Sequence, residues 1–308
     1  RRDALDIVPP DARRRLVETL HVSDDELETW DEISRRLFVP FHDGGIISQF
    51  EGYGDLLEFD WDGYREAYGD IQRLDRILEA EGDSPNRYKA SKQADVLMLF
   101  YLFSAEEVTQ LFEQLGYDFD RKSIPEQIDY YLRRTAHGST LSWVAHAWVL
   151  ARSNRRRSWR LFCSALDSDV ADIQGGTTPE GIHLGAMAGT VDLLQRCYVG
   201  IETRGGILHF NPALPDELSR LSATLRYRGH TLDVEVRPDL LTVASRTATA
   251  DPVTIGYRGR FRRVSPGTRH AFRIVRRVDR GDERHEERTQ EQLRCAPCGE
   301  ATEAEAAQ

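Results

Sequence analysis

Residues 172–190 read DIQGGTTPEGIHLGAMAGT, a glycine- and threonine-rich loop that runs into an apolar segment of small residues. The adjacent glycines Gly175 and Gly176 permit positive φ angles and close approach of a ligand to the backbone. Pro179 suits the first turn of a helix, and the threonines before it offer N-cap oxygens. Because free N–H groups at a helix N-terminus favour an anion, the stretch predicts either an anion site or an ordinary capped turn. It matches neither the phosphate-loop nor the dinucleotide-loop motif.

The chain upstream of this loop has the pattern of successive helices. Three serine–glutamate pairs have the spacing of capping boxes, which predicts helices of about ten to fifteen residues joined by short loops, as in bundles and toroids. These pairs are Ser23–Glu26, Ser104–Glu107 and Ser123–Glu126. Residues 86–103 (NRYKASKQADVLMLFYLF) are predicted to form one helix with Lys89 and Lys92 on one face. Residues 182–198 are predicted to form a long, nearly uncharged helix that is buried on most of its surface.

Residues 39–61 interrupt the helical pattern with glycines and aromatic side chains. The aromatic residues of this segment are Phe41, Phe50, Tyr53, Phe59 and Trp61. Flat rings stack on the apolar faces of sugars, so the segment is a candidate wall of a carbohydrate site. The same rings equally suit core packing beneath a long loop.

Residues 133–146 (RRTAHGSTLSWVAH) contain a turn rich in hydroxyl groups. Ser139, Thr140 and Ser142 have the composition of an N-cap for the helix that follows. An N-cap explains these hydroxyl groups, but it does not explain the adjacent His137. A ligand site built from hydroxyl groups and an imidazole is the alternative interpretation.

The hydrophobic period changes from helical to alternating near Gly205. Short alternating segments separated by Gly, Pro and Asp predict an antiparallel β-sandwich of about seventy residues. We therefore expect a helical domain over residues 1–203, a β domain over 204–276 and a disordered tail over 277–308. The tail contains a lone CAPC sequence without a second pair of ligands, so no metal site is predicted.

The composition is that of an ordinary globular chain with 308 residues and a formal net charge of −10. This charge argues against nucleic acid or an anionic membrane as a general partner. No apolar run is long enough to cross a membrane, and no signal peptide is visible. The four cysteines do not form a disulfide framework, so a cytoplasmic location is expected. Because the chain begins with Arg1, we expect a fragment of a longer protein.

Four segments resemble glycoside hydrolase family 65 in their order and spacing. They are GGIISQFEGYGDLLEFDW, SKQADVL, RTAHGSTLSWVAHA and GTTPEGIHLGAMAGT. That family contains inverting phosphorylases of trehalose, maltose, kojibiose and nigerose, together with acid trehalases. The resemblance covers residues 1–274. It implies a mainly helical fold, the rear part of an (α/α)6 toroid, followed by a small antiparallel β-sandwich domain.

The resemblance also implies the roles of individual residues. Lys92, Gln93 and His137 correspond to contacts of the substrate sugar. A second group corresponds to contacts of inorganic phosphate: Ser139, Thr140, Thr177, Thr178 and His183. Attack by phosphate on the face opposite the departing sugar inverts the configuration and releases β-glucose 1-phosphate. The implied partners are a disaccharide and phosphate as co-substrate, without cofactor or metal, and a homodimer is allowed.

The general acid that this chemistry requires is not recognisable in the chain. An inverting reaction needs an acid that protonates the leaving oxygen. In this family it is a glutamate in a D-E-Y-H type motif, so we expect it upstream of residue 1 and do not assign the role to Glu51. The chain is thus expected to be the inactive C-terminal part of a trehalose-type phosphorylase. The alternatives are a hydrolase fragment, with Glu180 as the base that activates water, and a non-catalytic carbohydrate-binding remnant.

Overall fold

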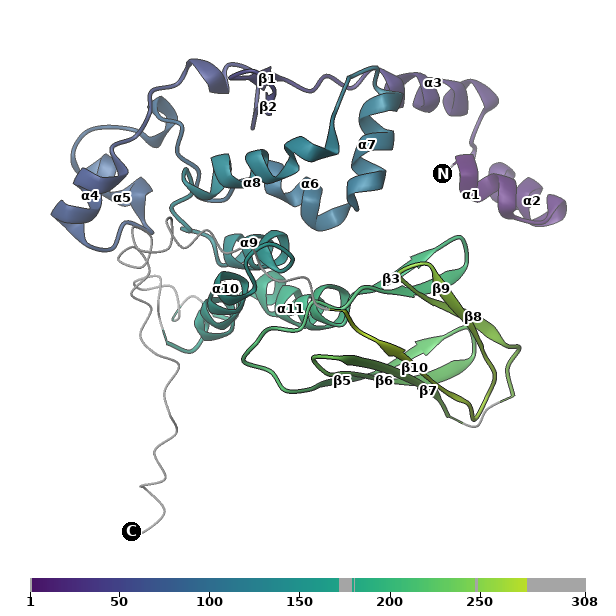
Figure 1. Cartoon of the computed structure of the whole chain (residues 1–308). Helices are drawn as coiled ribbons and strands as arrows, with labels where there is room; N and C mark the ends of the chain where they lie inside the picture. The colour runs from purple at the N-terminus through teal and green to yellow at the C-terminus, as the bar shows by residue number, and fades with distance from the viewer. Residues whose placement is uncertain (1, 172–178, 180, 247–248, 276–308) are drawn as a thin grey trace, which may run out of the picture.

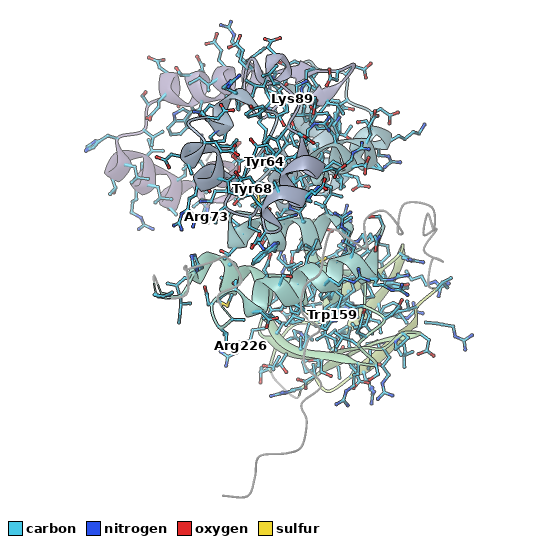
Figure 2. The ribbon with its side chains drawn as sticks, turned by 90° about the vertical axis from the view of Figure 1, so that its left-hand side faces the viewer. Tyr64, Tyr68, Arg73, Lys89, Trp159 and Arg226 are labelled. Carbon is cyan, nitrogen blue, oxygen red and sulfur yellow. The ribbon has the colours of Figure 1, made fainter. Side chains whose placement is uncertain are left out.

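The computed structural model describes residues 2–171, 179, 181–246 and 249–275, as a series of helices followed by two packed β-sheets (Figure 1). The predicted order of a helical part and a β-sandwich is confirmed. Helices α9–α11 lie between the other helices and the sandwich in both views (Figures 1 and 2). Within the described part of the chain, no helix is long and apolar enough to cross a membrane. The predicted tail with its CAPC sequence lies outside the described residues.

The first three helices contribute little to the hydrophobic core. They are α1 (Arg2–Ile7), α2 (Pro10–Leu20) and α3 (Asp24–Arg35), and they extend to one side of the molecule (Figure 1). Neither α2 nor α3 has a buried residue. Apolar side chains of this region are largely exposed, including Ile33 at 54% and Phe38 at 66%.

The aromatic segment that follows forms a short hairpin and a turn, β1 (Phe41–His42), β2 (Ile46–Ile47) and η1 (Tyr53–Asp55). Tyr53 and Phe59 are buried in hydrophobic clusters, so core packing is the correct interpretation for these two rings. Phe50 is 53% exposed and packs edge-on against Tyr53. The segment is therefore a packed layer rather than a continuous exposed row of rings.

The middle of the helical part consists of short helices, of which α4, α5 and α6 are shorter than predicted. They are α4 (Trp61–Tyr68), α5 (Leu74–Ala80), η2 (Pro85–Arg87), α6 (Val96–Leu102), α7 (Ala105–Gln114), η3 (Arg121–Ser123) and α8 (Ile124–Leu132).

The prediction of one helix over residues 86–103 is wrong. The chain is not helical between η2 and α6, because its N–H groups bond to other segments: Lys89 N donates to Leu57 O at 2.7 Å, and Ser91 N donates to Arg134 O at 2.8 Å. Lys89 and Lys92 therefore do not share a helical face.

The three predicted capping boxes have different outcomes. Ser104 and Glu107 form the complete box, with Ser104 N donating to Glu107 Oε2 at 2.8 Å. Ser23 accepts a bond from Glu26 N, which is half of a box. The box at Ser123 is wrong, because η3 runs into α8 and holds Ser123 in a helical conformation without a side-chain cap.

The last helices are α9 (Thr140–Leu150), α10 (Arg155–Asp167) and α11 (Leu184–Asp192), and α11 continues as the π-helix η5 (Leu193–Tyr198). The prediction that residues 182–198 are buried on most of their surface is wrong for the first half, since Leu184 is 76% exposed and Val191 is 53% exposed. The buried face of α11 contains Gly189, where an added Cβ would lie 2.7 Å from Val144 Cγ1. A larger residue there would push α11 away from α9.

The sandwich contains two four-stranded sheets with a shared apolar core. One sheet has the order β10-β7-β6-β5 and the other the order β3-β4-β8-β9. The strands are β3 (Ile201–Arg204), β4 (Ile207–Phe210), β5 (Leu221–Tyr227), β6 (His230–Val236), β7 (Leu240–Ser245), β8 (Val253–Tyr257), β9 (Arg260–Val264) and β10 (Arg269–Arg273). All pairs are antiparallel except β4 with β8, which are parallel.

The contrast between two serines gives a direct test of the capping assignments. We expect Ser104→Ala to lower the free energy of unfolding by about 1 kcal/mol, because it removes the acceptor for Glu107 N and the partner of the Glu107 carboxylate. Ser123→Ala should change it by less than about 0.5 kcal/mol, since that side chain caps nothing. Urea unfolding followed by circular dichroism measures both, and equal losses would contradict the assignment.

Candidate active site

Two segments that are distant in sequence are joined by backbone hydrogen bonds at one end of the helical part. Ser91 N donates to Arg134 O, and Ala136 N donates to Ser91 O, both at 2.8 Å. Ser91 also pairs with Thr135 as an isolated parallel bridge. This pairing brings the residues that follow Ser91 beside the turn that precedes α9.

The side chain of Gln93 is held in a fixed orientation by this arrangement. Ser139 Oγ donates to Gln93 Oε1 at 3.0 Å, and Gln93 Nε2 donates to Asp95 Oδ1 at 3.2 Å. Ser139 stands at the N-cap position of α9, but its side chain does not cap the helix. The expected N-cap role of this hydroxyl group is therefore wrong, and the hydroxyl positions Gln93 instead.

Gly138 makes room for the side chain of Lys92. A Cβ atom on Gly138 would lie 2.9 Å from Lys92 Cγ and 2.5 Å from the carbonyl oxygen of Gln72. Because a backbone carbonyl cannot move as a side chain can, only glycine fits here. Lys92 thus lies along the turn and is itself exposed, so its ammonium group is available to a ligand.

A second segment leads into this site from the aromatic layer. Gln49 Nε2 donates to Ser91 Oγ, and Gln49 Oε1 accepts from Val96 N, both at 3.0 Å. Lys89 forms ion pairs with Asp43 at 3.8 Å and Glu58 at 3.5 Å, in the part of the molecule opposite the sandwich (Figure 2). These contacts anchor the loop on both sides of Lys92 and Gln93.

Two histidines, the half-buried His137 and the buried His146, flank a single serine at the start of α9. His137 Nδ1 lies 3.0 Å from Ser142 Oγ, and His146 Nδ1 donates to Ser142 O at 2.7 Å. The two imidazole centroids are 4.6 Å apart. His137 has a φ of 57°, an uncommon conformation for a non-glycine residue that costs about 1 kcal/mol or more.

The environment of both rings favours their neutral forms. Burial lowers the pKa of His146 to about 4, with a further lowering by Arg157. Burial also lowers the pKa of His137 well below its usual value, and the neighbouring His146 adds to this effect. The turn therefore presents uncharged imidazole and hydroxyl groups, which suit hydrogen bonds to neutral hydroxyl groups.

His183 is fixed by a carboxylate that the sequence analysis did not identify. His183 Nδ1 lies 2.6 Å from Asp169 Oδ1, and His183 N donates to Asp169 Oδ2 at 2.9 Å. Because Nδ1–H is taken by the carboxylate, Nε2 is the ring nitrogen left for a ligand. The Asp169 side chain is only 6% exposed. The sequence carries no signal for this pair, since Asp169 follows α10 and lies 14 positions before His183.

The helix connections bring His183 to the same end of the molecule as the turn at His137. Helices α9 and α10 pack together across a short loop and are therefore antiparallel, so the end of α10 lies near the start of α9. Asp169 follows the end of α10 and holds His183 at the start of α11. No described contact joins His183 directly to Ser139 or Thr140, and the Thr140 side chain is buried.

The remaining predicted residues are two threonines of the phosphate region and Glu180, the base of the alternative hydrolytic reaction. Thr177, Thr178 and Glu180 lie outside the described residues. Among the residues that the structure describes, no cluster of three or more His, Cys, Asp or Glu side chains could hold a metal ion.

The neutral state of buried His146 predicts a loss of stability in acid. Its native pKa of about 4 lies below the ordinary 6.5 that the unfolded chain regains, so protonation favours unfolding as the pH falls from about 6.5 towards 4. Between pH 7.5 and pH 5, this group should lower the free energy of unfolding by about 2 kcal/mol. Urea denaturation at the two pH values measures the difference.

The matched variants are His146→Asn and His21→Asn. Asparagine at position 146 keeps a donor for Ser142 O but does not titrate, so the acid loss should shrink by about 2 kcal/mol. His21 is exposed at the end of α2, and its substitution leaves the contact of His146 with Ser142 O in place, so the acid loss assigned to His146 should remain. An unaltered acid loss in His146→Asn would refute the role of this ring.

Comparisons with known proteins agree with this architecture. The glycosyl hydrolase family 65 central catalytic domain matches residues 3–192, and the C-terminal domain of the same family matches residues 201–261. A solved structure from the human microbiome, assigned as a kojibiose phosphorylase, superimposes with a TM-score of 0.64 at 20% identity. The superposition covers 86% of this chain and 36% of the solved chain. At 20% identity, this similarity supports a shared fold and carries no conclusion about activity.

Relatives with higher identity are longer than this chain. An uncharacterized glycosyl hydrolase of Mycobacterium tuberculosis is 53% identical over 265 residues, which are 86% of this chain and 20% of the relative. Trehalose 6-phosphate phosphorylase of Lactococcus lactis is 36% identical over 232 residues, or 75% of this chain and 30% of the relative. The matches to both domains confirm the resemblance seen in the motifs, and the chain belongs to glycosyl hydrolase family 65.

Proposed function

We propose that the chain is the C-terminal part of an inverting α-glucosyl disaccharide phosphorylase of trehalose type. The observation that carries the proposal is the Asp169–His183 pair at the N-terminus of α11, which suits an attacking phosphate. Its relatives include trehalose 6-phosphate phosphorylase at 36% identity and the 1,2-alpha-glucosylglycerol phosphorylase of Bacillus selenitireducens at 29%. Phosphate is the co-substrate of this reaction, which needs no cofactor, and we expect it to occur in the cytoplasm.

Lys92, Gln93 and His137 suit the binding of the glucosyl unit. Gln93 offers an amide whose orientation is set by Ser139 and Asp95. His137 is an uncharged ring at a fixed backbone position, and Lys92 adds one exposed positive charge beside it. Fixed polar groups of this kind hold a sugar in one orientation, so that its anomeric carbon is presented to the nucleophile.

The phosphate would bind at the start of α11. His183 occupies the N-cap position of this nine-residue helix, where N–H groups and the helix dipole favour an anion. Asp169 holds the ring through Nδ1, so Nε2 can donate to a phosphate oxygen when the ring is protonated. Thr177, Thr178, Ser139 and Thr140 remain proposed contacts of the same anion.

We propose that the active site is completed by a part of the catalytic domain outside this chain. The apolar face formed by Ile182, Leu184 and Val191 is 69%, 76% and 53% exposed, as expected for a surface that packs against further protein. The general acid is proposed to lie in that part. The 308-residue chain alone should therefore have no measurable turnover.

A phosphorolysis assay tests the proposed reaction. We expect the full-length protein that carries this chain to release β-glucose 1-phosphate from trehalose or trehalose 6-phosphate, and only when phosphate is present. Maltose, kojibiose and nigerose should react at least tenfold more slowly, because the departing glucose is linked through a different hydroxyl group and is presented to the site in a different orientation. Equal release of glucose with and without phosphate would show a hydrolase instead.

The Asp169–His183 pair generates a second prediction for the same full-length protein. His183→Ala should raise the KM for phosphate at least tenfold, equivalent to about 1.4 kcal/mol, with a much smaller effect on the KM for the disaccharide. Asp169→Asn should also raise the KM for phosphate more than the KM for the disaccharide, but by a smaller factor, because the His183 ring keeps a hydrogen-bond partner. His21→Ala is the control. Parallel changes in both KM values would show that His183 only supports the fold.

A further inference from the structure

A cavity of about 430 Å³ lies where the helical part meets the sandwich, at the opposite end of α9 from the candidate active site. The loop between α9 and α10 contributes Arg152, and the sandwich contributes Val236, Arg258 and Ile274. Its volume is in the range of small-molecule sites, which is about 300–1,000 Å³. None of its lining residues has been given a role in the proposed reaction.

The described lining of this cavity is strongly cationic. It contains four arginines and no acidic residue. Arg237 is paired with Glu235 at 2.8 Å, so its charge is largely offset. Arg152 and Arg258 have no carboxylate within ion-pairing distance among the described residues, and the positive charge of this pair is uncompensated there.

Backbone carbonyl groups hold both of these arginines in place. Arg152 Nη2 donates to Asn211 O at 3.2 Å, and Arg258 Nη1 donates to Val275 O at 3.0 Å. Each guanidinium group has five N–H donors, so most of them remain for a ligand. The 13-residue helix α10 also begins at the cavity with Arg155, and the positive end of its dipole adds to the field.

We propose that this cavity binds a small phosphate monoester, with Arg152 and Arg258 on the phosphate group. Guanidinium groups bind phosphate oxygens in a bidentate manner, and the uncompensated charge of two arginines suits the charge of about −1.5 to −2 that a phosphate monoester carries near pH 7. The remaining volume is bounded by apolar side chains, including Leu214, Val236 and Ile274, which suit the carbon skeleton of the ester. A phosphorylated sugar has both a phosphate group and such a carbon skeleton.

The cavity is separate from the phosphate region of the proposed active site. Thr140 begins α9 at the candidate active site, and Arg152 lies two residues beyond the end of α9 at Leu150. The eleven residues of this helix span about 16 Å, which separates the two places by more than the length of a phosphate ester. Binding at the cavity can therefore be measured independently of the proposed reaction.

Isothermal titration calorimetry with glucose 6-phosphate, inorganic phosphate and glucose tests the site in the 308-residue chain. We expect glucose 6-phosphate to bind more tightly than inorganic phosphate, and glucose not to bind. Arg152→Gln combined with Arg258→Gln should weaken the glucose 6-phosphate affinity at least tenfold, whereas His183→Ala should leave it unchanged. The same affinity in the double variant, or no binding of glucose 6-phosphate to the unmodified chain, would overturn the proposal. Equal affinities for inorganic phosphate and glucose 6-phosphate would overturn the proposal that the site recognises a phosphate ester.

The control variant is Arg226→Gln. Arg226 is an exposed residue of β5 at the edge of the sandwich (Figure 2), and it lies five positions from Leu221, the partner of Val236. It is therefore about 16 Å along the strand from the cavity. Its substitution removes one positive charge and should not change the affinity.

Chemical modification provides a test that does not depend on the folding of a variant. Phenylglyoxal modifies arginine side chains, and mass spectrometry identifies the modified positions. Glucose 6-phosphate should lower the modification of Arg152 and Arg258 at least threefold and leave Arg226 unaffected. Equal modification of all three residues with and without the ester would overturn the site.

Discussion

The candidate active site depends on one pair of backbone hydrogen bonds, in which Ser91 donates to Arg134 and accepts from Ala136. This pairing ends the possibility of a helix through residue 91 and holds the segment extended. It also fixes the register of two loops, so that Gln93 meets Ser139 and Lys92 meets Gly138. A backbone pairing sets these positions independently of side-chain rotamers, which gives a precise site on irregular segments.

Features that depend on neighbouring residues could be predicted from the sequence, whereas features that depend on distant residues, such as this pairing, could not. The complete capping box at Ser104 was predictable because its partners lie three residues apart, and the strands were predictable because alternation is a local pattern. The helix predicted over residues 86–103 failed because its N–H groups bond to residues far away in the chain. The capping box predicted at Ser123 does not form because a preceding 3₁₀ turn continues directly into α8.

The site shows the same division between local and distant contacts. The family motifs predicted Lys92, Gln93, His137 and His183 as site residues, but not the groups that orient them. The contact between Asp169 and His183 spans 14 positions, and that between Gln49 and Ser91 spans 42. Such partners have no fixed spacing, so only the path of the chain reveals them. His146 was not singled out in the sequence, and its contact with Ser142 O emerges only from the structure of α9.

The α9–α10 hairpin separates two kinds of electrostatic environment. At the start of α9, burial keeps His137 and His146 neutral, and the polar groups there suit an uncharged sugar. Beyond the end of α9, Arg152 and Arg258 give the cavity its uncompensated positive charge. The antiparallel packing of the two helices also places the positive end of α10 at the cavity and its negative end near Asp169.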